Sequence, residues 1–93
     1  MENPKGIREK TDPEATRIAV LGIIIEDKEQ ISQVNSLLHQ YAQYVIGRMG
    51  LPYEKRKMNI ISVVVDAPAD KISALSGKLG RLSGVTSKAL YSK

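Results

Sequence analysis

The sequence of 93 residues predicts an α+β domain with a four-stranded antiparallel sheet and two helices on one face. Two short apolar runs, at 18–25 and 58–65, are rich in β-branched residues and favour buried strands. Two other segments, at 27–41 and 66–80, repeat apolar residues every three or four positions, as one face of a helix does. With two weaker strands the order is βαββαβ, the ferredoxin-like plan, whose first and third strands lie centrally in the sheet.

Residues 1–16 are expected to form a disordered N-terminal tail, followed by the ferredoxin-like domain at 17–93. The tail contains Pro4, Gly6 and Pro13 among charged and polar residues and has one large aliphatic side chain. A chain of this length accommodates one small domain, so we expect no second catalytic or DNA-binding domain.

The first strand ends at the acidic pair Glu26 and Asp27. Asp27 is a suitable N-cap for the first helix, and Gln30 has the spacing of its capping-box partner. The apolar positions of this helix are Ile31, Val34, Leu37, Leu38 and Tyr41.

The second strand is predicted at 44–51 and is interrupted by Gly47 and Gly50, which indicates an edge position. A polar, basic connection at 52–57 leads to the third strand. Asp66 and Pro68 then mark the start of the second helix, and a last strand follows at 85–92. The apolar stripe of the second helix is Ile72, Leu75 and Leu79, and its predicted stop is Gly80.

The two central strands are apolar at both even and odd positions, although the ferredoxin-like plan leaves one face of the sheet uncovered. An apolar sheet face that the chain itself leaves uncovered indicates a surface that binds a partner. Another copy of the chain is the simplest one, so we expect a homodimer or homotetramer.

Composition excludes several classes of site. The chain has no cysteine, which removes disulfides, thiolate metal sites and cysteine nucleophiles. It has neither Phe nor Trp, and its central strands offer no aromatic platform for bases. No apolar run approaches the ~20 residues of a membrane span and the first 17 residues contain no signal-peptide core, so we expect a cytoplasmic protein with no membrane partner.

Catalysis and a resident cofactor are not expected. His39 is the single histidine and lies about 120° from the apolar stripe of the first helix, at the surface, where it is a poor metal site on its own. The carboxylates Glu26, Asp27 and Glu29 are explained by the preference for acidic side chains at a helix start.

Charge is divided unevenly along the chain. The first 44 residues carry five basic and seven acidic residues, and the remaining 49 carry nine basic and three acidic. The basic half suits phosphate, nucleotide or nucleic acid, or is only a solvated surface. The residues of this alternative anion or nucleic-acid surface are Arg48, Lys55, Arg56, Lys57, Lys78, Arg81 and Lys88.

Three segments carry a family resemblance. They are Leu-His-Gln-Tyr at 38–41, Ile-Gly-Arg-Met-Gly-Leu-Pro-Tyr at 46–53, and Leu-Ser-Gly-Lys-Leu-Gly-Arg-Leu at 75–82 with Gly84-Val85 after it. Together they resemble the regulator family of the iron-only hydrogenase system, over nearly all of Arg17–Lys93. The glycine-flanked arginine and the Gly-Lys-Leu-Gly-Arg motif are specific in combination.

The resemblance implies a stand-alone ACT-like domain, related in fold to the C-terminal sensing domain of the nickel-responsive repressor. It implies a non-enzymatic, ligand-sensing regulatory module that binds a small-molecule effector between subunits. In this chain the effector residues would be Glu26, Asp27, Gly47, Arg48, Met49 and Gly50.

The repressor's nickel site and DNA-binding domain do not carry over, because this chain has one histidine and no ribbon-helix-helix segment. Transcriptional regulation would then act through a partner. The alternatives are direct nucleic-acid binding and an adaptor that binds a regulatory or maturation protein.

Overall fold

The computed structural model describes residues 15–92, so the predicted tail at 1–16 lies almost wholly outside the described part. Within that part the order is βαββαβ, with short 3-10 turns at three connections. The strands are β1 (Arg17–Ile25), β2 (Val45–Tyr53), β3 (Met58–Ala67) and β4 (Val85–Tyr91), and the helices are α2 (Ile31–Gln40) and α3 (Ala69–Gly80). Neither helix is long and apolar enough to cross a membrane.

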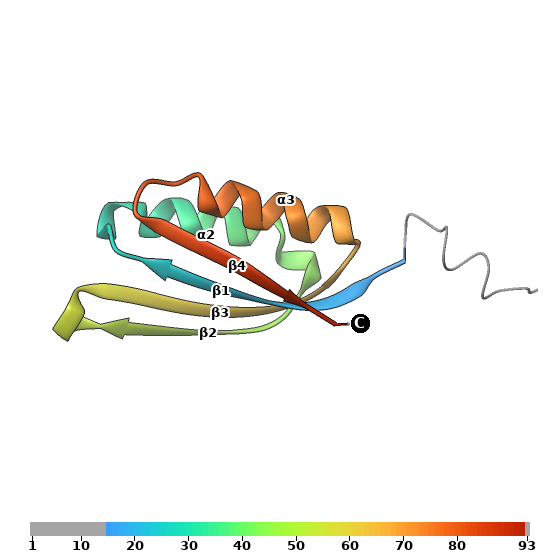
Figure 1. The fold of residues 1–93 in the computed structure, drawn as a ribbon, viewed down its shortest axis with the longest axis horizontal. Helices are drawn as coiled ribbons and strands as arrows, with labels where there is room; N and C mark the ends of the chain where they lie inside the picture. Colours follow the sequence, from blue (N-terminus) through green and yellow to red (C-terminus); the bar gives the residue numbers. More distant parts are fainter. Residues whose placement is uncertain (1–14, 93) are drawn as a thin grey trace, which may run out of the picture.

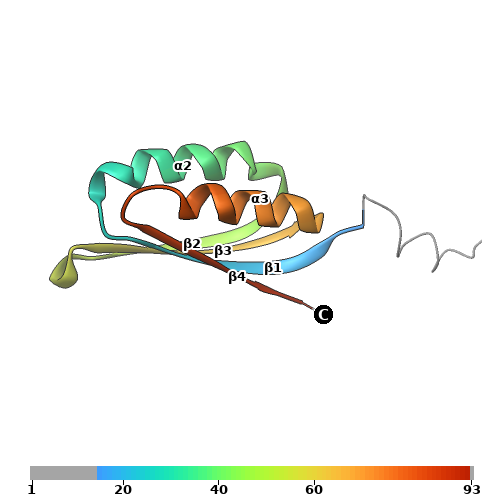
Figure 2. The same ribbon diagram turned by 45° about the horizontal axis from the view of Figure 1, so that its top comes forward.

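The sheet is antiparallel with the strand order β2-β3-β1-β4, and both helices lie on the same face of it (Figures 1 and 2). This arrangement confirms the predicted ferredoxin-like fold, with the two most apolar strands in the centre. β2 lies at an edge, as its two glycines indicated.

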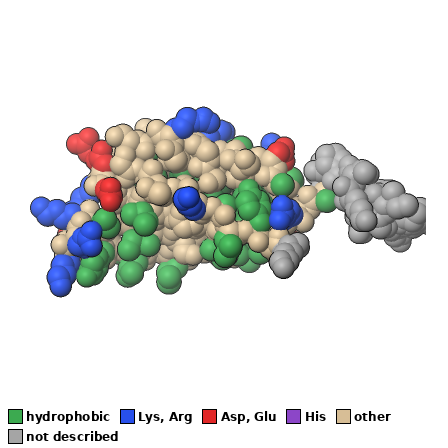
Figure 3. All heavy atoms as spheres, in the orientation of Figure 1, with side chains coloured by type: hydrophobic (Ala, Val, Ile, Leu, Met, Phe, Trp, Pro, Cys, Tyr) green, Lys and Arg blue, Asp and Glu red, His purple; other side chains and the backbone are tan. Residues whose placement is uncertain are grey.

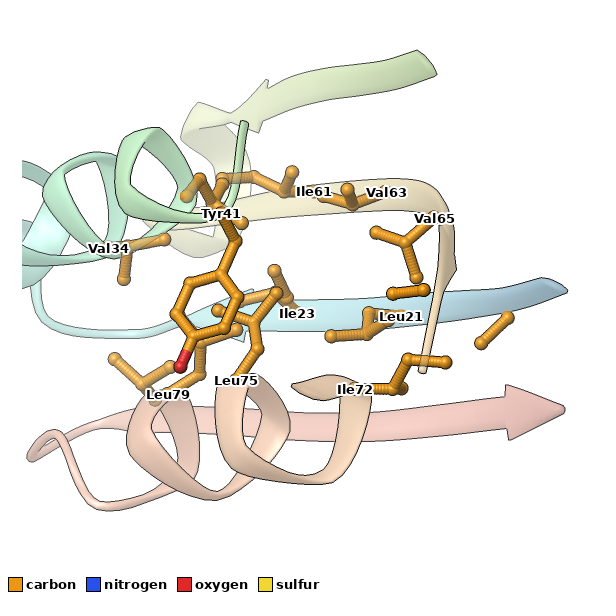
Figure 4. Packing of buried hydrophobic residues seen from close by; sticks show 14 of the residues in the cluster. Leu21, Ile23, Val34, Tyr41, Ile61, Val63, Val65, Ile72, Leu75 and Leu79 are labelled. Atoms are coloured by element: carbon orange, nitrogen blue, oxygen red, sulfur yellow. The ribbon is translucent and has the colours of Figure 1, made fainter. Parts of the chain in front are cut away.

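The hydrophobic core fills the space between the sheet and the helices. Leu21 and Ile23 of β1 are fully buried, and they lie opposite Val63 and Ile61 of β3 on the helix side (Figure 4). Tyr41, at the end of α2, points toward α3. The core cluster is Ala19, Leu21, Ile23, Ile25, Val34, Leu38, Tyr41, Ile61, Val63, Val65, Ala67, Ile72, Leu75, Leu79 and Val85.

Two helix starts differ from the sequence prediction. Asp27 does cap, since its Oδ1 accepts a hydrogen bond from Glu29 N at 3.0 Å, but it caps a 3-10 turn, and α2 itself begins at Ile31. Gln30 occupies the N-cap position of α2 and makes no side-chain capping bond. Asp66 belongs to β3, where it lies opposite Ile18, because strand pairing extends two residues beyond the predicted end.

The loop between α3 and β4 packs against the junction between β1 and α2. Gly84 has φ +71°, and a Cβ at this position would lie 2.8 Å from Asp27 Cβ. Its carbonyl accepts a hydrogen bond from Glu26 N at 2.8 Å. Gly84 is therefore required by both its backbone conformation and its neighbour.

The first and last strands also meet at the ends of the domain. Ser92 N donates to Ile18 O at 2.8 Å, and Arg17 Nη2 donates to Ser92 O at 2.6 Å. The guanidinium of Arg17 lies over the ring of Tyr91, 4.7 Å from its centroid.

Candidate functional site

The acidic pair of the predicted effector site lies where β1 ends. Glu26 is exposed and Asp27 is half-buried by its contact with Gly84. An exposed ion pair, Lys28 Nζ to Glu54 Oε1 at 3.8 Å, connects this junction to the β2–β3 hairpin. The acidic junction is thus attached to both neighbouring loops.

The glycine-rich part of the predicted site lies in β2, where all residues after Val45 are exposed. A bulge lies between Val45 and Gly47, and neither Gly47 nor Gly50 has an atom within 4 Å of a Cβ built on it. Arg48 faces the helices, because it lies opposite Val63, and its Nη2 donates to Asn35 Oδ1 of α2 at 3.1 Å.

These two parts of the predicted site do not converge within one copy. Ile25 lies opposite Asn59, which lies opposite Pro52, so the acidic junction is near the hairpin end of β2. Arg48 is four residues back along that strand, about 13 Å at the usual rise, and two strand spacings across. A ligand that contacts both parts has to be large or to lie between copies.

The basic residues of the alternative surface fall into separate groups. Lys55, Arg56 and Lys57 are exposed together at the tip of the β2–β3 hairpin, where Lys57 has a left-handed φ of 54°. Lys78 and Arg81 belong to the end of α3, where Lys78 Nζ lies over the Tyr41 ring at 5.3 Å. Lys88 lies on β4, on the sheet face away from the helices. These positions form no continuous basic surface with Arg48.

His39 is exposed on α2, as its helical position predicted. Among residues 15–92 no three His, Cys, Asp or Glu side chains are grouped closely enough to hold a metal ion.

A groove of about 530 Å³ lies between α3 and β4. Ser76 and Ser87 meet in it, with 3.2 Å between their hydroxyl oxygens. Gly77 and Gly80 line it, and a Cβ on either would meet at most Arg81 Nη2 at 4.0 Å. No close packing among residues 15–92 therefore explains these two helix glycines. Gly80 is the last residue of α3, as predicted, but has no positive φ.

Among the described residues, nearly all large apolar side chains that are exposed lie on the sheet face away from the helices, and we call it the open face. Figure 3 shows hydrophobic side chains along the sheet side of the molecule. Met49 is 66% exposed and Leu90 is 73% exposed. The apolar residues of the open face are Ile18, Val20, Ile24, Met49, Leu51, Tyr53, Met58, Ile60, Val64 and Leu90.

One feature of the open face was missed from the sequence. Gly22 lies in the middle of β1, between Ser62 of β3 and Lys88 of β4, and leaves a notch at the centre of the face. The available signal was a glycine inside a β-branched run, which is unfavourable without a neighbour that needs the space.

A family model described as "TM1266-like: Iron-only hydrogenase system regulator, putative" matches residues 17–89. A solved structure titled "The structure of uncharacterized protein TM1266 from Thermotoga maritima" is similar, with a TM-score of 0.81 and 38% sequence identity. The match covers 84% of this chain and 99% of that one. No curated protein matches this chain.

Proposed function

Because the chain belongs to the TM1266-like family of iron-only hydrogenase system regulators, we propose that it is a cytoplasmic, non-enzymatic regulator that acts as a homo-oligomer. The observation that carries the proposal is the open face. A small domain that exposes this much apolar sheet has a surface for association rather than an enclosed site for chemistry.

The open face is not needed to complete the fold of one copy. The core on the helix side already buries large side chains such as Leu21, Val63 and Leu79 to 0% exposure. The apolar residues of the open face expose an area on the order of 700 Å² per copy, near the roughly 800 Å² per partner of a standard interface. One further copy that contributes the same area makes an interface of ordinary size.

Binding rather than catalysis is supported by the placement of the polar groups. Apart from the half-buried Asp27, the charged residues of both predicted surfaces, such as Glu26, Arg48 and Lys55, are exposed, and they are distributed over different elements. The groove between α3 and β4 is lined largely by serine and glycine. Acid–base catalysis requires titratable groups that converge on a concave site.

A small-molecule effector is the second part of the proposal. Met49 and Gly47 lie on the open face, whereas Arg48 and Gly50 lie on the helix side of β2. An effector that contacts Met49 would therefore lie between two copies, where its binding changes their association.

Native mass spectrometry of protein purified from its own host tests both parts. We expect a dimer or larger assembly with a retained extra mass, which would give the mass of the effector. An assembly without extra mass would contradict the effector and favour an adaptor for a regulatory or maturation protein. A bare monomer would contradict the whole proposal.

Direct nucleic-acid binding is the second candidate, and the basic hairpin tip is the observation that favours it. Lys55, Arg56 and Lys57 protrude together and are free to contact consecutive phosphates. Three phosphate contacts predict a slope of about −2.7 for log affinity against log salt. Replacing all three by glutamine should abolish that slope, and a nucleic-acid affinity that does not change with salt excludes this function.

A further inference from the structure

The notch at Gly22 lies between two apolar rows of the open face. Residues directly opposite one another across the four strands form each row, and the rows are named here by their β1 residue. The Gly22 row is Met49, Ser62, Gly22 and Lys88; the Ile24 row is Leu51, Ile60, Ile24 and Thr86; the Val20 row is Gly47, Val64, Val20 and Leu90. Small residues thus occupy the middle of the central row, with larger apolar side chains on both sides.

Nothing within the described chain explains a glycine at position 22. A Cβ built there has no atom within 4 Å, and among residues 15–92 only Gly84 is a glycine with a positive φ. Glycine in the middle of a strand costs roughly 0.5–1 kcal/mol relative to alanine. The same position in a β-branched run would otherwise favour Val or Ile.

We propose that the Gly22 notch receives the Ile24 side chain of a second copy, and that each copy gives and receives one such contact. Ser62 of one copy then faces the partner's Ile60. This inference rests on the proposed self-association and adds its register, the specific way in which the two open faces meet. Such reciprocal contacts are what a two-fold symmetric dimer requires.

Aligned sheets that pack face to face keep their strands within about 30° of each other, so rows of one copy meet rows of the other. If the Gly22 rows met each other, two notches would face and leave a void, which close-packed interfaces avoid. Suppose instead that the Gly22 row of one copy met the Val20 row of the other. The two-fold symmetry would then also place the Ile18 row, which contains the Asp66 carboxylate, over the partner's Ile24 row. A buried carboxylate without a partner is costly.

The remaining register places the Gly22 row against the Ile24 row. The Val20 row then meets the row of Tyr53 and Met58. On β1 this row continues to Glu26, which follows the end of the strand and is exposed, so its carboxylate lies at the rim of the contact and reaches water. Asp66 lies beyond the contact. Lys88 meets Thr86 at the β4 edge, where a lysine extends its ammonium group to water. Apolar residues fill the centre of this interface and charges remain at its rim, as in stable protein interfaces.

The variant Gly22→Val tests the notch. The added side chain has open space within one copy and suits a strand, so the variant should fold with unchanged circular dichroism and an equal or higher melting temperature. It occupies the space that the partner's Ile24 needs. The dimer dissociation constant, measured by analytical ultracentrifugation, should rise by at least about tenfold, since two overpacked contacts form per dimer.

Rescue by a second substitution establishes the register. The double variant Gly22→Val with Ile24→Ala removes the clashing atoms and should recover most of the lost association. The matched control, Gly22→Val with Val20→Ala, removes a similar side chain from the other flanking row and should recover nothing. Gly80→Ala, at another open glycine away from this face, should leave the dissociation constant unchanged.

The outcomes separate this inference from the proposed function. A wild-type monomer contradicts both. A wild-type dimer that Gly22→Val does not weaken, or that Val20→Ala rescues instead of Ile24→Ala, contradicts the register and leaves self-association intact. If Gly22→Val does not fold, Gly22→Ala provides the same test with a smaller group, and unchanged association of that folded variant contradicts the notch.

Discussion

The two faces of the sheet differ in accessibility much more than in composition. On β1 the side chains toward the helices, such as Leu21 and Ile23, are fully buried, while Val20 and Ile24 on either side of this pair are 36% and 40% exposed. All four are large aliphatic residues. Apolar character alone therefore does not say which face of the sheet the helices of the same chain cover. The difference has to be tested face by face.

The largest expected effect is a charge placed on either face of the central strands. Val63→Lys puts an ammonium group into the core and should cost more than about 4 kcal/mol, enough to unfold a domain of this size. Ile24→Lys places the same group on the open face and should give a folded monomer. Circular dichroism together with sedimentation distinguishes the two results, and two folded assemblies of unchanged mass would remove the distinction between the faces.

Two glycines allow a finer comparison. Gly84→Ala forces a methyl group toward Asp27 at a positive φ and should destabilise the fold by about 1–3 kcal/mol. Gly22→Ala should stabilise the isolated copy by roughly 0.5–1 kcal/mol, because the space around it is open. Urea denaturation of dilute, monomeric protein gives both values. A loss of stability at Gly22 would mean that its role lies within the fold and not between copies.

The smallest effects concern the candidate effector residues. Asp27→Ala removes the bond to Glu29 N and should cost about 1 kcal/mol of the free energy of unfolding, as for other N-caps. Arg48→Ala removes one exposed bond to Asn35 and should cost under about 1 kcal/mol. If Arg48 contacts the effector, its variant should lose the extra mass in native mass spectrometry while keeping the assembly. A retained mass would exclude it from the site.

Much of the fold was predictable because its signals are local. The β-branched runs identified the central strands, and the interruptions at Gly47 and Gly50 indicated the edge position of β2. The errors arose where tertiary contacts outweighed local signals. Asp66 resembles a helix start but pairs with Ile18 in the sheet, and Asp27, which packs against Gly84, caps a 3-10 turn that precedes α2.

The candidate site was less predictable because it depends on register. The family resemblance implied that Arg48 and Asp27 belong to one site, but the pairing of β2 with β3 separates them along and across the sheet. No short motif encodes that offset. Gly22 was overlooked for a related reason: a missing side chain is informative only when its neighbours on adjacent strands are known.

The hydrogen bond between Ser92 and Ile18 has a consequence for the order of folding. β2 and β3 are joined by a short hairpin and pair after closing a small loop, whereas β1 and β4 pair only when nearly the whole domain has been gathered between them. Closing that long loop costs entropy before any of its contacts form. The β1–β4 pairing therefore gives the domain a high contact order and slows its folding. On a nascent chain, the open face of β1 and β3 is therefore exposed before β4 is in place. The free edge of β1 is covered last, when β4 pairs with it and brings the charged Lys88 to the edge of the sheet.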